Sequence, residues 1–125
     1  MSTRALFVFD RDNWCYVFPS VEDTENGLEA NDVDADEYVV LDQDGTVFES
    51  SLEGLDVRLR ATDVRDPALL QDRLSIFMQE LRIKCTSEDV IDIGNAILRA
   101  AWEDRWPRRP RWLARHLHGN EPPTL

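Results

Sequence analysis

The sequence predicts an α+β protein built on a mainly antiparallel sheet of about five strands, with helices packed on one face. Strand-like segments fill the first half of the chain and helical segments the second, in the order ββαβββααα. Short turn signals separate most of the strands, as in hairpins. The 125 residues suit one domain and can bury a core without disulfides or metals. We expect a single domain over residues 1–118 and a flexible tail over residues 119–125.

The first two strands are predicted from apolar runs. Residues 5–9 are continuously apolar, which is typical of a buried strand, and residues 14–18 are aromatic and β-branched. The polar residues 10–13 between them favour a tight turn, because Asp and Asn bond to their own backbone. The two segments therefore predict a β-hairpin.

Three further strands follow. Residues 38–41 and 46–49 flank the turn signal Asp-Gln-Asp-Gly at 42–45. Residues 55–61 alternate between apolar and polar side chains, with Leu55, Val57, Leu59 and Ala61 on one side. This alternation predicts a half-solvated antiparallel strand.

The helices are predicted from caps and from 3.6-residue periodicity. Ser20 can cap a short helix that runs to about Leu28, and an acidic loop should follow at residues 31–37. Asp66 and Pro67 begin a longer helix, and Thr86 or Ser87 caps the next. A short helix around residues 112–117 should end at Gly119. The expected buried positions of the two long helices are Leu70, Leu74, Phe77, Met78 and Leu81, and Val90, Ile93, Ile97 and Ala101.

The segment Phe-Val-Phe-Asp-Arg-Asp at 7–12 resembles the first motif of haloacid-dehalogenase-type phosphatases. That resemblance would make Asp10 a nucleophile and Asp12 an acid or base. Trp14 stands where that family has Thr or Val, and a strand follows at once instead of a loop and helix. We therefore interpret the two aspartates as turn residues, with a small Mg²⁺-dependent phosphatase as the less favoured alternative.

No other pattern predicts a metal, a cofactor or a catalytic centre. Asp32, Asp34 and Asp36 resemble the start of an EF-hand calcium loop, but Glu37 replaces its glycine and Gln43 its last glutamate. The two histidines, His116 and His118, do not share a helical face, and zinc needs three or four ligands. Glycine-rich phosphate loops and nucleophile motifs are absent from the sequence. We expect a protein that is not an enzyme and needs no cofactor.

Charge is distributed unevenly along the chain. The net charge is −11, and residues 1–56 carry 15 acidic and 2 basic side chains. Between residues 22 and 37, eight carboxylates occur without Lys or Arg. Such a field speeds the encounter with a basic partner, although it also serves solubility alone. The predicted partner-binding residues are Glu22, Asp23, Glu25, Glu29, Asp32, Asp34, Asp36 and Glu37.

The second half contains the opposite pattern. Residues 105–118 hold five arginines and no carboxylate, interleaved with Trp106 and Trp112. Cations interleaved with aromatic rings can bind nucleic acid. Alternatively, the Trp rings pack on the core and the Arg side chains are solvated at the surface, or the segment pairs with the acidic half of the chain. Because the whole chain is strongly acidic, we expect no direct nucleic-acid binding, and a monomer or a weak homodimer.

The apolar stretch at residues 5–9 is too short for a signal-peptide core or a membrane span, so we expect a cytoplasmic protein. Cys15 in an apolar run fits a small buried thiol.

In size, acidity and lack of catalytic motifs, the chain resembles bacterial toxin immunity proteins. This resemblance implies an inhibitor that holds a basic toxin or nuclease against an acidic patch. A nucleic-acid-mimicking adaptor that blocks DNA-binding proteins is the alternative.

Overall fold

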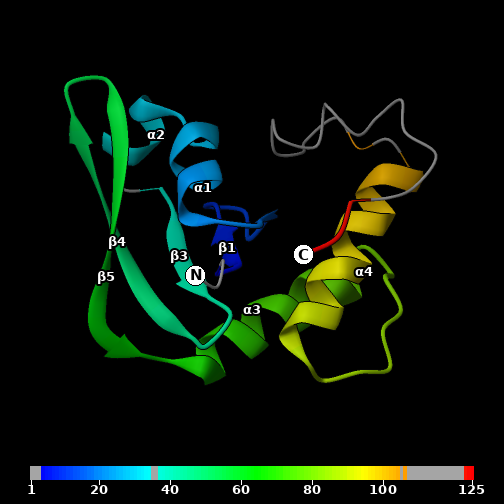
Figure 1. Ribbon diagram of the computed structural model, residues 1–125. Coiled ribbons are helices and arrows are strands. Elements are labelled where there is room, and N and C mark those ends of the chain that lie inside the picture. The colour runs from blue at the N-terminus through cyan, green and yellow to red at the C-terminus, as the bar shows by residue number, and fades with distance from the viewer. Residues whose placement is uncertain (1–3, 35–36, 105, 107–122) are drawn as a thin grey trace.

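The computed structural model describes residues 4–34, 37–104, 106 and 123–125. Figure 1 shows strands and helices that confirm the predicted α+β class and, approximately, the predicted order. Instead of a plain acidic loop, a short helix, α2, forms after α1, and the helix expected near residue 112 lies outside the described residues. The elements are β1 (Leu6–Phe9), β2 (Cys15–Phe18), α1 (Val21–Gly27), α2 (Ala30–Asp34), β3 (Val39–Asp42), β4 (Thr46–Glu53), β5 (Asp56–Arg65), α3 (Pro67–Glu80) and α4 (Val90–Glu103).

The five strands form one antiparallel sheet in the order β2-β1-β3-β4-β5. The predicted hairpin β1–β2 pairs Leu6 with Phe18 and Phe9 with Cys15. Strands β4 and β5 are longer than expected and form an arm that extends past the other strands (Figure 1). All four residues of the inner strand β1 are fully buried, so both faces of the sheet are covered there.

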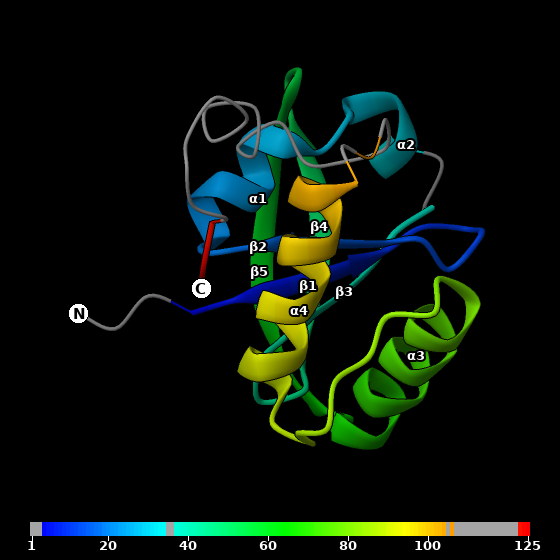
Figure 2. The same ribbon diagram turned by 90° about the vertical axis from the view of Figure 1, so that its right-hand side faces the viewer.

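Helices cover the two faces unequally. A Cβ atom added at Gly94 of α4 would lie 3.3 Å from the Phe7 ring, and one at Gly27 of α1 would lie 2.6 Å from the Phe18 ring. Phe18 pairs with Leu6, the neighbour of Phe7, and neighbours along a strand point to opposite faces. The long helix α4 therefore covers one face and the short helix α1 lies on the other, so the helices are not confined to one face as predicted. Figure 2 shows α4 in front of β1 and β2, with α3 beside it.

The turns of the sheet also position α3. The buried Asp42 carboxylate accepts hydrogen bonds from the Asp44 and Thr46 amides at 2.8 and 2.9 Å and pairs with Arg4 at 3.1 Å. The amide of Asp66, the N-cap of α3, donates to the Gly45 carbonyl at 2.8 Å. The β3–β4 turn therefore packs directly against the start of α3.

Three aromatic rings join the β1–β2 hairpin to the late helices. Trp14, Phe77 and Trp106 pack edge to face, with centroids 5.3–5.9 Å apart.

The last described residues of the chain contact α4. The Leu125 amide donates to the Asn95 side-chain oxygen at 2.7 Å, and Pro123 is buried. Of the tail expected to be flexible, these last residues lie against α4, and residues 119–122 are outside the described part. Within the described ranges, no helix combines the length and apolar character that a membrane crossing needs.

Candidate functional site

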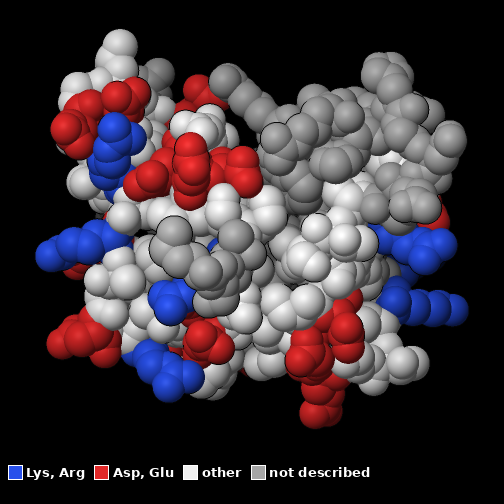
Figure 3. Space-filling model, viewed as in Figure 1, with Lys and Arg blue, Asp and Glu red and all other residues white. Residues whose placement is uncertain are grey.

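The carboxylates of α1 are partly committed to the helix itself. Asp23 occupies the third position after the N-cap Ser20, whose hydroxyl accepts from the Asp23 amide at 3.1 Å and donates to its carboxylate at 3.0 Å. This arrangement resembles a capping box, and it satisfies one free amide of the first turn, that of Asp23. Glu22 on the same helix is exposed. Carboxylates gather over α1 in Figure 3.

Glu25 holds the outer edge of the sheet. Its carboxylate accepts a hydrogen bond from the Leu59 amide of β5 at 2.7 Å. Glu53 and Asp56 close a two-residue hairpin, so the amide of every second residue in β5, Leu59 included, points away from β4. Glu25 therefore occupies an edge group that would otherwise be open to pairing with another strand.

The hairpin turn at residues 10–13 is built around Asp10. One carboxylate oxygen of Asp10 accepts from the amides of Asp12 and Trp14 at 2.9 and 3.0 Å, and Asn13 adopts the left-handed φ of 62°. Asn13 also exchanges hydrogen bonds with Arg73 of α3, at 3.1 and 3.2 Å. This geometry supports the interpretation of the Asp-x-Asp segment as a turn and fixes its place against α3.

An acidic pocket of about 260 Å³ lies between this turn and the residues that follow α2. Four carboxylates and one guanidinium line it, a net formal charge of −3, together with two tyrosines. The lining residues are Asp10, Arg11, Asp12, Tyr16, Asp32, Glu37 and Tyr38. We call this group the acidic pocket.

Hydrogen bonds hold the walls of the acidic pocket in place. The Tyr38 hydroxyl donates to Asp32 at 3.0 Å, the Tyr16 hydroxyl lies 3.5 Å from Asp10, and Arg11 pairs with Glu37. Burial of the Tyr38 ring, and then the Asp32 carboxylate, raise the pKa of the Tyr38 hydroxyl well above its usual range. Tyr38 thus stays a neutral donor at physiological pH. The pocket therefore offers oriented carboxylates to a cation.

The described residues contain no group of three or more His, Cys, Asp or Glu side chains placed to hold a metal ion. The pocket carboxylates are instead spread between the hairpin turn and α2.

The structure divides the predicted partner-binding residues. Asp32 and Glu37 line the acidic pocket, whereas Glu22, Asp23 and Glu25 belong to α1. Figure 2 shows α2 towards the end of β1 and α1 towards its beginning, so the two groups are separated. Glu29 is exposed between the two helices. The side chain of Asp34 and all of Asp36 lie outside the described residues.

Asp10 and Asp12 join the pocket although their positions in the sequence, 22 and 20 residues before Asp32, did not suggest it. The signal that could have found them is strand register. Because Phe9 pairs with Val39, the residues just beyond this pair, Asp10 and Tyr38, emerge side by side at the same end of the sheet.

The arginine-rich segment at residues 105–118, including His116 and His118, lies outside the described residues except for Trp106. Trp106 packs against Trp14 and Phe77. Cys15 is buried and Cys85 is half-buried, and both are free thiols.

The chain matches no family model, and neither the curated proteins nor the solved structures contain a significant match to it.

Proposed function

We propose that this protein is a non-enzymatic binding protein, an acidic inhibitor or immunity protein that neutralises a basic toxin or nuclease. The observation that carries the proposal is the acidic pocket, where Asp10, Asp12, Asp32 and Glu37 line one cavity together with Arg11. A pocket of this charge is suited to an Arg or Lys side chain of the partner.

The physical argument rests on charge and preorganisation. Charge-assisted hydrogen bonds are about twice as strong as neutral ones, and Arg can form two with one carboxylate. Internal hydrogen bonds already orient Asp10 and Asp32, so the partner does not have to order them. The net charge of −11 adds long-range attraction to a basic protein.

The test compares three immobilised baits in lysate of the source organism at low and moderate salt. The first is the native protein, and the second carries Asp12→Asn and Asp32→Asn in the pocket. The third carries Asp63→Asn and Glu80→Gln, two exposed positions outside the pocket, so it loses the same charge. We expect one stoichiometric basic protein on the native and charge-matched baits, released by salt and lost from the pocket variant.

The captured protein is then purified, and its affinity and its own activity are measured against each variant. Inhibition by the native protein, weakened at least tenfold by the pocket substitutions alone, supports the proposal. Equal affinity for the pocket variant contradicts the assignment of the contact. A spread of DNA-binding proteins on the native bait favours a nucleic-acid mimic, and no partner at either salt refutes the proposed function.

A further inference from the structure

A second pocket, of about 590 Å³, lies between α3, the connection that follows it and the first turn of α4. Its volume is within the range of about 300–1,000 Å³ that is usual for small-molecule sites. Within the part of the chain that the structure describes, the two pockets have no lining residue in common. We call it the helix pocket.

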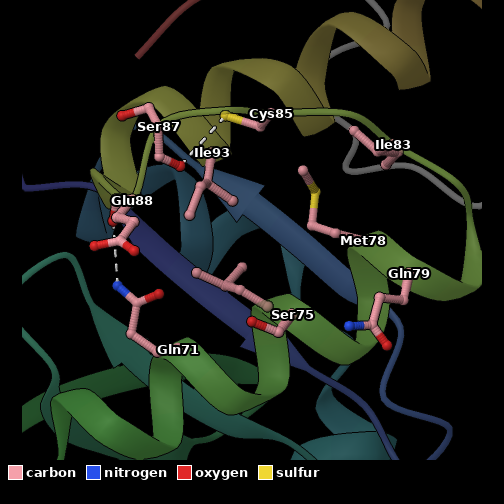
Figure 4. A pocket seen from close by; sticks show the side chains of 10 residues that line it. Gln71, Ser75, Met78, Gln79, Ile83, Cys85, Ser87, Glu88 and Ile93 are labelled. Atoms are coloured by element: carbon pink, nitrogen blue, oxygen red, sulfur yellow. Dashed lines mark hydrogen bonds between the residues drawn. The ribbon is translucent and has the colours of Figure 1, made fainter.

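The helix pocket has an apolar interior. Leu74 of α3 and Ile93 of α4, both buried, form part of its wall, and the half-buried Met78 and Ile83 extend the apolar surface. Figure 4 shows Met78 and Ile83 towards one end of the pocket, and Gln71 and Glu88 at the other. The flexible thioether of Met78 can adapt to different apolar groups.

The opposite end is polar and acidic. The Gln71 side-chain amide donates to the Glu88 carbonyl at 3.4 Å, which ties α3 to the connection. Among the described residues that line the pocket, Glu88 alone is charged. The acidic Asp89 and Asp92 follow it at the start of α4, and Figure 3 shows a second gathering of carboxylates over this region. The field at this end therefore favours cations and disfavours anions.

We propose that the helix pocket binds a small organic cation with an apolar body, such as an alkylammonium ion. The ammonium group lies at Glu88, and the hydrocarbon chain runs over Leu74 and Ile93 towards Met78. The side-chain amides and hydroxyls of the rim, including Gln71 and Ser75, supply further hydrogen-bond partners. This site is independent of the proposed inhibitor function.

The protein contains its own reporter for this site. Cys85 lines the helix pocket and is half-buried, with its thiol 3.7 Å from the Ser87 carbonyl oxygen. Cys15 is buried in the core, and burial, then Asp10, raise the pKa of its thiol well above the ordinary value. Because the thiolate is the reactive form, an alkylating agent should modify Cys85 and spare Cys15 in the folded protein.

The experiment measures the rate of Cys85 carbamidomethylation by iodoacetamide, using intact-protein mass spectrometry at low ionic strength. Three probes with the same hydrocarbon body are compared at equal concentration: hexylammonium, hexanol and hexanoate. We expect hexylammonium to slow the modification most and hexanoate least. Amide chemical-shift changes in NMR spectra locate the bound probe independently of the thiol.

Matched variants test the space inside the helix pocket and the charge of Glu88 separately. Ser75→Phe fills the helix pocket and should abolish binding, whereas Ile76→Phe, next to it on α3 but outside the lining, should not. Glu88→Gln should weaken hexylammonium binding by about fivefold at most, as expected for an exposed ion pair, and leave hexanol unchanged. Glu80→Gln, an exposed position outside the pocket, serves as its control.

Three results would overturn the proposal. The first is that no probe slows Cys85 modification or shifts the amides of α3 and α4 at millimolar concentration. The second is that hexanoate binds as tightly as hexylammonium. The third is that Ser75→Phe binds hexylammonium as tightly as the native protein in the NMR titration.

Discussion

Many aspartates in this chain satisfy backbone amides. Asp66 caps α3 by accepting from the Leu69 amide at 3.0 Å, and Asp89 caps α4 by accepting from the Ile91 amide at 2.9 Å. Asp10 and Asp42 do the same in turns. Part of the acidic composition is therefore turn and cap chemistry, which Asp performs well in any protein. The carboxylates that remain for a partner are fewer than the net charge suggests.

The first prediction concerns Asp10. Replacing it with Ala removes the acceptor of two backbone amides, and we expect the free energy of unfolding to fall by about 2 kcal/mol. Asp10→Asn keeps one oxygen in the same place and should lose much less. Urea unfolding followed by tryptophan fluorescence measures both variants. If Ala and Asn were equally stable, the turn would not depend on this oxygen.

The second prediction concerns the pH dependence of Tyr38. Its raised pKa means that the folded state favours the neutral hydroxyl, while an unfolded tyrosine ionises near about pH 10. The stabilisation is therefore complete below about pH 10 and is lost as the pH rises towards the pKa of the folded state. Ultraviolet titration of the phenolate should show a late component that is absent from Tyr38→Phe. Asp32→Asn should shift that component to lower pH, and a titration unchanged by either substitution would contradict the assignment.

At the scale of elements, the β3–β4 turn and the start of α3 depend on each other. Gly45 has a φ of 82°, and a Cβ atom there would lie 2.6 Å from Cα of Pro67. Gly54, at the tip of the β4–β5 arm, has a φ of 66° but nothing within 4 Å. The two glycines therefore share a left-handed conformation and differ in packing.

The third prediction uses this difference. Gly54→Ala should cost only the left-handed strain, about 1 kcal/mol of unfolding free energy. Gly45→Ala should cost at least about 2 kcal/mol more, because the backbone of α3 must move. Thermal and urea unfolding of the two variants test the comparison. Equal losses would mean that the turn and α3 are not packed as described.

The outer edge of β5 is covered at one position by a side chain from another element, which the sequence pattern of β5 does not predict. Val57 is buried and Leu59 is half-buried, as the alternation predicts, but Ala61 is exposed, and Leu55 lies before the start of β5 and is 89% exposed. The edge is closed at Leu59 by Glu25, which comes from α1. A residue predicted for partner binding thus helps to prevent unwanted strand pairing.

At the scale of the whole molecule, the net charge of −11 opposes folding through self-repulsion. The ion pairs that counter it are largely at the surface. Arg58–Glu53, for example, joins side chains that are 49% and 76% exposed. Such pairs contribute little, so the repulsion should dominate the response to salt.

The fourth prediction follows from this balance. Raising NaCl from about 10 mM to about 200 mM shortens the screening length from about 30 Å to about 8 Å. We expect the midpoint of thermal unfolding to rise by about 2–5 °C, which corresponds to roughly 1 kcal/mol. Scanning calorimetry measures the shift, and Asp63→Asn with Glu80→Gln should reduce it. A midpoint that falls with salt would mean that internal ion pairs outweigh the repulsion.

Local signals in the sequence were enough to predict the class of the fold, the β1–β2 hairpin, the antiparallel pairing and the start of α3 at Asp66, because they act between residues close in the chain. The start of α4 was predicted wrongly: its N-cap is Asp89 and not Thr86 or Ser87. Which carboxylates meet depends on the tertiary structure. Strand register brings Asp10 to Tyr38, α2 adds Asp32 to the same pocket, Glu25 bonds to β5, and residues of α3 and α4 line the helix pocket. These contacts join residues that are 20 to 40 positions apart in the chain, or residues of different helices. No local sequence pattern predicts them, because they depend on how the whole sheet and its helices pack.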